Sequence, residues 1–242
     1  MQDLRCGKWN DQADAMFTGR YDPRNNNVPP GERTTLFCTN RDVAKLNDKC
    51  LAALPTAKRS FKMIVTGEAR HYRDNRFKYP RELNVAVGAR VMILKNNFPD
   101  YHNGTVGIVT DIQDDCISVE DIKSHRTFAI QRETEEFPSP HDPETIIGSY
   151  RQFPLRLSWA ITVHKSQGQT YDEVYVDVSG NFALGHVYTA FSRVRSLEGL
   201  HLLSPDYLPK IPTPPELRAW LTPSSGKSMS PIGNSTTETT LT

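Results

Sequence analysis

Short hydrophobic runs separated by polar turns mark the first part of the chain, and they predict alternating strands and helices. Residues 34–38 form an apolar run that is typical of a buried strand. Residues 42–54 repeat apolar side chains at helical spacing, and Asn40 can cap that helix. Residues 61–66 predict a second strand. Strand, helix and strand in this order favour an α/β sheet.

The pattern changes near Pro80. Residues 84–94 are strand-like around one glycine. Three further short strands are predicted after it, at residues 105–112, 116–120 and 125–130. Tight turns separate these strands and no helical pattern intervenes, which is typical of a small β-barrel. Residues 133–150 are polar and contain prolines, so we expect a linker there.

The α/β pattern then returns. It predicts strands at residues 155–159, 173–178 and 200–203, with a helix at residues 184–194. We therefore expect an α/β domain that is built from residues 34–79 and 151–203 and interrupted by a barrel insert at residues 80–132. An insert of this kind requires its two ends to lie close together.

The two ends of the chain differ from this middle part. Residues 3–20 predict one short helix, and residues 21–33 contain the asparagines and prolines of a linker. Residues 204–242 are rich in proline, serine and threonine, which predicts a disordered tail.

Charge and cysteine content narrow the function classes. The formal net charge is +1, so any nucleic-acid surface has to be a local patch. The four cysteines are far apart, which argues against a zinc site and a disulfide framework and favours a reducing compartment. No apolar run is long enough to span a bilayer, and the first residues lack a signal-peptide core. We expect an intracellular protein without a membrane partner.

One polar connection concentrates the candidate chemistry. It follows the predicted strand at residues 155–159 and carries Thr162, His164, Lys165, Ser166, Gln167, Gly168 and Thr170. All but the glycine have hydrogen-bonding side chains, and the glycine allows backbone to approach a ligand closely. Such a segment suits phosphate, either of a nucleotide or of a nucleic-acid backbone. A solvated polar loop is the alternative interpretation.

Three parts of the chain together resemble a known family. They are residues 153–170, residues 187–200, and residues 87–92 with 103–109. In combination they resemble the C-terminal half of a superfamily 1 DNA helicase of the petite-integration-frequency (PIF) family, on the RecD-like branch, over residues 1–203. The resemblance implies a second RecA-like domain, with the parallel sheet of P-loop NTPases, that carries an SH3-like insert. It also implies that residues 1–20 are the tail of a first RecA-like domain.

The resemblance implies roles for individual residues through three helicase motifs. Thr39 and Asn40 resemble motif IV, residues 162–170 resemble motif V, and residues 188–195 resemble motif VI. The residues expected to contact DNA are Thr39, Asn40, Thr162, His164, Lys165 and Ser166. The residues expected to bind nucleotide are Gln167, Gly168, Thr170 and Arg193.

Arg193 is the expected catalytic residue, an arginine finger. Such fingers contribute about 10³ to 10⁵ in rate in phosphoryl-transfer enzymes. Arg195 is the neighbouring candidate, and because residues two apart on a helix face different ways, only one of the two should reach the phosphate. A surface salt bridge is the alternative for either. Cys38 stands where some superfamily 1 relatives have a second arginine finger, so a finger from motif IV is not expected.

No phosphate-binding loop of the form G-x-x-x-x-G-K-[ST] occurs in the sequence, and the near match at residues 226–228 lacks a preceding strand. Asp172 and Glu173 precede a predicted strand and Asp177 lies inside it, so none is predicted to bind metal. The resemblance implies ATP and Mg²⁺ for the intact helicase, with the main ligands from the missing first domain.

The chain alone is therefore expected to be inactive, and its expected partners are single-stranded DNA and a first RecA-like domain. The family resemblance places a eukaryotic member in the nucleus or mitochondrion. The alternative is a non-catalytic module that binds single-stranded nucleic acid or another protein.

Overall fold

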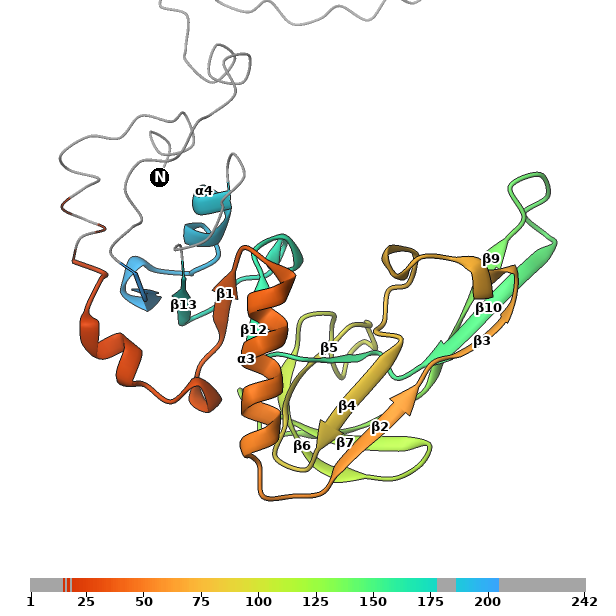
Figure 1. Cartoon of the computed structure of the whole chain (residues 1–242), viewed down its shortest axis with the longest axis horizontal. Helices are drawn as coiled ribbons and strands as arrows, with labels where there is room; N and C mark the ends of the chain where they lie inside the picture. The colour runs from red at the N-terminus through yellow and green to blue at the C-terminus, as the bar shows by residue number, and fades with distance from the viewer. Residues whose placement is uncertain (1–14, 16, 18, 178–185, 205–242) are drawn as a thin grey trace, which may run out of the picture.

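The computed structural model describes residues 15, 17, 19–177 and 186–204. The predicted tail after residue 204 and most of the predicted helix at residues 3–20 lie outside the described residues. The described part is a mixed α/β structure with one parallel sheet and three antiparallel sheets (Figure 1). Within it, no helix is long and apolar enough to cross a membrane.

Four short strands form the parallel sheet, in the order β12-β1-β13-β14. They are β1 (Thr35–Phe37), β12 (Ala160–Thr162), β13 (Val174–Val176) and β14 (Leu200–Leu202). Nearly all of their residues are buried, as expected for parallel strands that are covered on both faces. The predicted strands near residues 34–38, 173–178 and 200–203 are confirmed as members of this sheet, with residue 178 outside the described residues.

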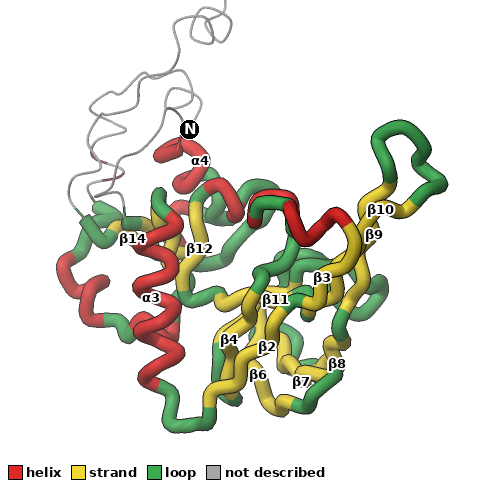
Figure 2. The backbone as a smooth tube through the Cα atoms, turned by 45° about the vertical axis from the view of Figure 1, so that its right-hand side comes forward, coloured by secondary structure: helices red, strands yellow, loops and turns green. Residues whose placement is uncertain are grey.

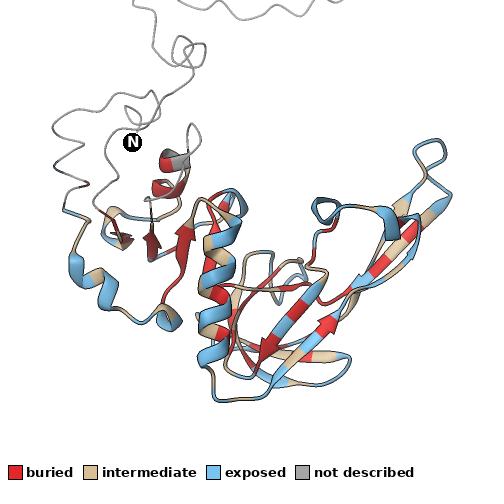
Figure 3. Ribbon diagram, viewed as in Figure 1, coloured by how far each residue is buried: buried red, intermediate tan, exposed pale blue. Residues whose placement is uncertain are grey.

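Two helices accompany this sheet. The predicted helix at residues 42–54 is confirmed as α3 (Asn40–Ala53), which packs against β1 and β12 and exposes its other face (Figure 3). The shorter α4 (His186–Phe191) adds Val187, Ala190 and Phe191 to the hydrophobic cluster of the sheet. The predicted helix at residues 184–194 therefore ends earlier than expected. We call the four strands with α3 and α4 the parallel unit.

A second unit is built from antiparallel strands around its own hydrophobic cluster. Five strands pair in the order β11-β5-β6-β7-β8, and two more, β2 and β4, pair with each other. Their bounds are β2 (Lys58–Lys62), β4 (Glu82–Ala86), β5 (Arg90–Ile93), β6 (Val106–Ile112), β7 (Cys116–Asp121), β8 (Thr127–Gln131) and β11 (Leu155–Leu157). We call this the antiparallel unit, and Figures 1 and 2 show α3 between it and the parallel sheet.

Two strand predictions were wrong about their partners. The strand predicted at residues 61–66 was placed in the α/β sheet, but β2 pairs antiparallel with β4. The strand predicted at residues 155–159 ends as β11 at Leu157 and pairs antiparallel with β5, so that β12 joins the parallel sheet in its place. A hydrophobic run predicts a buried strand but does not determine its neighbour. The predicted strand at residues 84–94 is divided by a turn at Gly88, where φ is +87°.

A three-stranded sheet projects from the antiparallel unit (Figure 1). It consists of β3 (Ile64–Gly67), β10 (Ile146–Gln152) and β9 (Glu133–Pro138), paired antiparallel in that order. Its aromatic cluster contains Phe77, Tyr79, Tyr150 and Phe137. The prediction of a linker at residues 133–150 was therefore wrong. β9 alternates partly buried and exposed residues at the sheet edge, so its sequence is as polar as that of a loop.

Short 3-10 turns complete the described elements, at Pro23–Asn27, Pro30–Glu32, Glu68–His71, Asp74–Arg76, His164–Ser166 and Leu197–Gly199. Phe17 is fully buried, with its ring centroid 4.9 Å from that of Phe191, and Tyr21 forms a parallel bridge with Leu202. The segment that we predict to end a first domain thus packs on the parallel unit, and its domain assignment stays a prediction.

Candidate functional site

The residues that resemble motifs IV and V meet at one edge of the parallel sheet. β1 and β12 are parallel neighbours with Phe37 opposite Thr162, and the Val163 N–H donates to Phe37 O at 2.9 Å. Thr39 and Asn40 follow β1, and His164 follows β12, so they lie at the same carboxyl edge. α3 also begins here, and the free N–H groups of its first turn favour an anion.

The hydroxyls in these segments are engaged by the protein itself. Thr39 caps α3, because its Oγ1 accepts the Asp42 N–H at 3.1 Å. The Oγ1 of the buried Thr162 accepts the Lys165 N–H at 3.3 Å. Ser166 is fully buried and its hydroxyl donates to Val163 O at 2.7 Å. These hydroxyls stabilise the turns, and the exposed members of the predicted set are Asn40, His164, Lys165, Gln167, Gly168 and Thr170.

The turn between β12 and β13 presents open backbone at Gly168. Its φ is +77°, a conformation that favours glycine, and no heavy atom lies within 4 Å of where a Cβ would be. The positive φ therefore favours glycine at this position, although the space around it would accept a side chain. On the carboxyl side of this glycine the Gln169 N–H donates to Ser166 O at 3.1 Å, so the Gly168 N–H is the backbone donor of this turn that is open to a ligand.

The segment after Thr170 is joined to the residues that resemble motif VI. The Tyr171 N–H donates to Arg193 O at 2.8 Å, and the Arg195 N–H donates to Tyr171 O at 2.9 Å. Tyr171 and Val194 form a parallel bridge between these bonds. Two of the predicted nucleotide-binding residues, Thr170 and Arg193, are thereby brought together.

The structure corrects the expected placement of Arg193 and Arg195 on a helix, because α4 ends at Phe191. The Arg193 guanidinium turns back to the end of that helix, where Nε donates to Thr189 O at 2.9 Å and Nη2 to Ser192 Oγ at 2.8 Å. A cation at a helix C-terminus is favourable.

Arg195 has a different partner. Its Nε lies 3.5 Å from Asp172 Oδ1, while Asp172 Oδ2 lies 2.6 Å from Lys123 Nζ. The hydrogen bond from Lys123 and the charges of Lys123 and Arg195 lower the pKa of Asp172. Arg195 thus has the surface salt bridge that was the alternative interpretation for the two arginines. In the described part of the chain Arg193 has no carboxylate within 4 Å.

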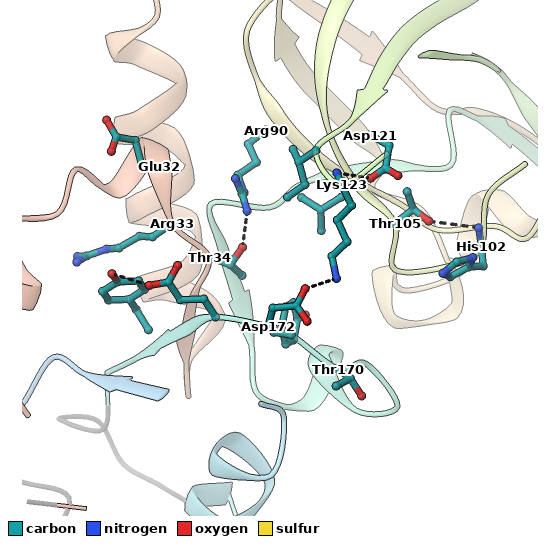
Figure 4. A pocket seen from close by; sticks show the side chains of 15 residues that line it. Glu32, Arg33, Thr34, Arg90, His102, Thr105, Asp121, Lys123, Thr170 and Asp172 are labelled. Atoms are coloured by element: carbon teal, nitrogen blue, oxygen red, sulfur yellow. Dashed lines mark hydrogen bonds and ion pairs between the residues drawn. The ribbon is translucent and has the colours of Figure 1, made fainter. Parts of the chain in front are cut away.

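A cavity of about 410 Å³ lies between the parallel and antiparallel units (Figure 4). Its lining side chains include Thr34, Arg90, His102, Lys123, Thr170 and Asp172. Figure 4 shows Arg90 directed to Thr34, where its Nη2 donates to Oγ1 at 3.0 Å, and Lys123 directed to Asp172. Sequence reasoning missed this cavity, because its walls come from five segments that are separated in the chain.

The turn also contacts the antiparallel unit through Gln169 and Tyr171. Gln169 Nε2 lies 3.4 Å from Met92 Sδ, and the Tyr171 hydroxyl donates to Gln169 Oε1 at 2.5 Å. Burial raises the pKa of Tyr171 far above its ordinary value. The phenol therefore stays neutral and serves as a hydrogen-bond donor.

The structure also corrects the position of Asp177. It was predicted inside a strand, but β13 ends at Val176, and Asp177 directly follows at the carboxyl edge. It lines a hollow of about 450 Å³ with Arg41, Lys45 and Lys49. Among the described residues, no three His, Cys, Asp or Glu side chains are grouped to hold a metal ion. The described part thus offers no ready set of direct ligands for Mg²⁺.

No protein-family model matches the chain, but individual known proteins do. A protein described as ATP-dependent DNA helicase Pif1, from Bdellovibrio bacteriovorus, is 32% identical over 207 residues, which cover 84% of this chain and 46% of that protein. The structure of unliganded Pif1 from Bacteroides sp. matches this chain with a TM-score of 0.77 at 30% identity. The matched region covers 94% of this chain and 55% of the Bacteroides chain.

A structure of Bacteroides Pif1 in complex with ADP-AlF3 and ssDNA has a TM-score of 0.65 at 30% identity, over 84% of this chain and 47% of the other. The chain thus spans about half the length of these relatives. Over most of its own length, it is homologous to the Pif1 ATP-dependent DNA helicases.

Proposed function

We propose that this chain is the C-terminal motor part of an ATP-dependent DNA helicase that translocates on single-stranded DNA and unwinds duplex. In this proposal the parallel unit is the second RecA-like domain and the antiparallel unit is its SH3-like insert. The observation that carries the proposal is the meeting of three motif-like segments on one sheet. Thr39 lies beside the end of β12, and Tyr171 is bonded to Arg193 and Arg195.

The DNA contacts fall to the exposed residues at the carboxyl edge of β1 and β12. Asn40, His164 and Lys165 lie there, beside the first turn of α3. Thr39, Thr162 and Ser166 act indirectly in this proposal, because their hydroxyls hold the turns. Amides, a cation and a helix N-terminus bind phosphate without reading bases, so the contacts are independent of sequence and sensitive to salt.

The nucleotide side of the proposal uses Gln167, Gly168, Thr170 and Arg193. ATP supplies the γ-phosphoryl group whose transfer to water drives the motor. Arg193 neutralises charge on that group, for which its guanidinium has to exchange Thr189 O and Ser192 Oγ for phosphate oxygens. In this proposal the phosphate-binding loop and the Mg²⁺ ligands come from a first RecA-like domain.

A binding titration tests the DNA side of the proposal. We expect a labelled oligothymidylate to raise its fluorescence anisotropy with added protein, and the affinity to fall about tenfold or more between about 50 mM and about 200 mM salt. Lys165→Gln should weaken binding. Lys62→Gln, a matched change at an exposed lysine of β2, should not.

Binding that is absent, or that does not respond to salt, would contradict the proposal. It would leave a protein-interaction module as the better interpretation of this chain.

A further inference from the structure

Arg156 lies between the two units, outside the segments that resemble helicase motifs. It is the middle residue of β11, and its neighbours Leu155 and Leu157 pack into the core of the antiparallel unit. Because side chains alternate along a strand, Arg156 faces the other way, on the same side as Met92, with which it is paired. Met92 belongs to the hydrophobic cluster of the parallel unit. The aliphatic part of the Arg156 side chain therefore lies between the hydrophobic clusters of the parallel and antiparallel units.

The charge of Arg156 has no counter-charge. Among the described residues, no carboxylate lies within 4 Å of Arg156 or of Lys165, and neither forms a side-chain hydrogen bond. Burial lowers the pKa of Arg156. The pKa of Lys165 is lowered mainly by burial and, to a smaller extent, by the positive charge of Arg156. The half-buried Arg156 thus lies near the exposed Lys165, and two like charges in proximity are unfavourable unless an anion joins them.

Arg90 shows that a half-buried arginine on this face can have a partner. It lies two residues from Met92 and shares its face of the sheet, and burial also lowers its pKa. Its Nη2 nevertheless donates to Thr34 Oγ1 at 3.0 Å. Of these two half-buried arginines on the same face, Arg156 is the one without a hydrogen-bond partner among the described residues.

Arg156 and Lys165 line the same hollow, of about 290 Å³, between α3, β4 and β12. This is several times the volume of about 30 Å³ that a water molecule occupies in the liquid. Asp48 and Glu82 also line the hollow, and Glu82 accepts a hydrogen bond from Ser60 Oγ at 2.6 Å. Neither acid pairs with Arg156 or Lys165, so both cations remain available to a ligand.

We propose that Arg156 and Lys165 together bind one internucleotide phosphate of single-stranded DNA in this hollow. The proposal rests on the proposed function and adds Arg156 to the DNA-binding residues. A phosphodiester supplies the missing negative charge, and its two free oxygens match the paired N–H donors of a guanidinium. The DNA then passes from the carboxyl edge at His164 into the hollow that Arg156 and Lys165 line.

The test is the salt dependence of oligothymidylate binding by Arg156→Gln. We expect about five- to tenfold weaker binding at low salt, and a plot of log affinity against log salt that is shallower by about 0.7, the contribution of one phosphate contact on a single strand. Arg151→Gln is the matched control, since it removes the same charge from an exposed position on β10. It should match the parent protein in both measurements.

A double variant tests whether the two cations share one phosphate. Lys165→Gln combined with Arg156→Gln should weaken binding by less than the product of the two single effects. A thermal melt checks the fold of each variant. If Arg156→Gln unfolds, Arg156→Lys decides instead, with weaker binding but an unchanged slope expected.

An Arg156→Gln variant that keeps the affinity and slope of Arg151→Gln overturns this inference, as does an Arg156→Lys variant with parental affinity. In both cases salt-dependent binding by the parent protein still supports the proposed function. A parent protein without salt-dependent binding overturns both proposals.

Discussion

Hydroxyl side chains near the carboxyl edge of the parallel sheet stabilise the backbone and leave little for a ligand. Thr39, Thr162 and Ser166 each bond within their own turn. The groups that remain exposed are a lysine, a histidine, amides and open backbone, and these contact phosphate far better than they distinguish bases. These residues therefore suit contacts with a phosphate backbone, which is the same for every nucleotide sequence, better than contacts with particular bases.

Cys38 provides a residue-scale prediction. Burial raises the pKa of its thiol from 9.0 to about 12, and the charges of Asp177 and Asp42 act in the same direction. The thiolate is the reactive form, so this rise lowers the reactive fraction on the order of a thousandfold near neutral pH. We expect iodoacetamide at pH 8 to modify Cys38 on the order of a thousandfold more slowly in the folded protein than in urea.

Mass spectrometry of the Cys38 peptide over time measures both rates. A folded-state rate within tenfold of the rate in urea would contradict the half-buried position of Cys38 near the charges of Asp177 and Asp42.

The sequence predicted which residue types gather near the site, but not the direction of their side chains. Thr162 was predicted to lie in a polar turn, whereas it ends β12 and is buried. Its hydroxyl is directed inward because the strand continues further than the polar pattern suggested. Arg156 carried no signal at all, because its lack of a partner depends on two sheets that meet only in the folded chain.

α3 links the edge strand of the parallel sheet to the rest of the protein. β12 is the edge strand, and its outer side pairs with the buried Asn47 of α3. The Asn47 amide donates from Nδ2 to Ala160 O at 3.0 Å, and its Oδ1 accepts the Ala160 N–H at 2.9 Å. One side chain thereby satisfies two backbone groups that would otherwise be buried without partners.

Asn47→Ala should destabilise the protein by about 1 to 3 kcal/mol, because both backbone groups of Ala160 would lose their partner. Asn75→Ala, at an exposed asparagine with no side-chain hydrogen bond in the described structure, should change stability by less than about 0.5 kcal/mol. Urea unfolding of the three proteins measures both differences. Equal stability of Asn47→Ala and Asn75→Ala would show that this side chain does not support β12.

The sequence predicted the helices and strands that have a strong hydrophobic pattern of their own. It did not predict the strands that form only by pairing with segments far away in the chain. α3 and the strands β1, β13 and β14 were visible because their own residues carry the pattern of burial. β9 and β10 were mistaken for a linker: β9 is an edge strand without a fully buried residue, and β10 is the central strand, whose two neighbours lie far apart in the sequence. The partners of β2 and β11 are set by tertiary packing, which no local pattern encodes.

The two units are joined at residues 169–172, where the segment that resembles motif V ends. Asp172 pairs with Lys123 of the antiparallel unit and with Arg195, and Gln169 contacts Met92. A displacement of this segment therefore acts on the antiparallel unit and on the residues that resemble motif VI at once. In a motor, such joints carry the change at the nucleotide to the contacts with DNA.

For the whole molecule, we propose that this chain supplies one wall of an ATP site, with Arg193 as its catalytic residue. The most direct measurement is ATP hydrolysis by this chain fused behind the first RecA-like domain of a Pif1 relative, in the presence of single-stranded DNA. We expect hydrolysis by the fusion and none by the chain alone, with a loss of about 10³-fold or more in Arg193→Ala. A fusion that hydrolyses ATP equally well with Arg193→Ala would contradict the account.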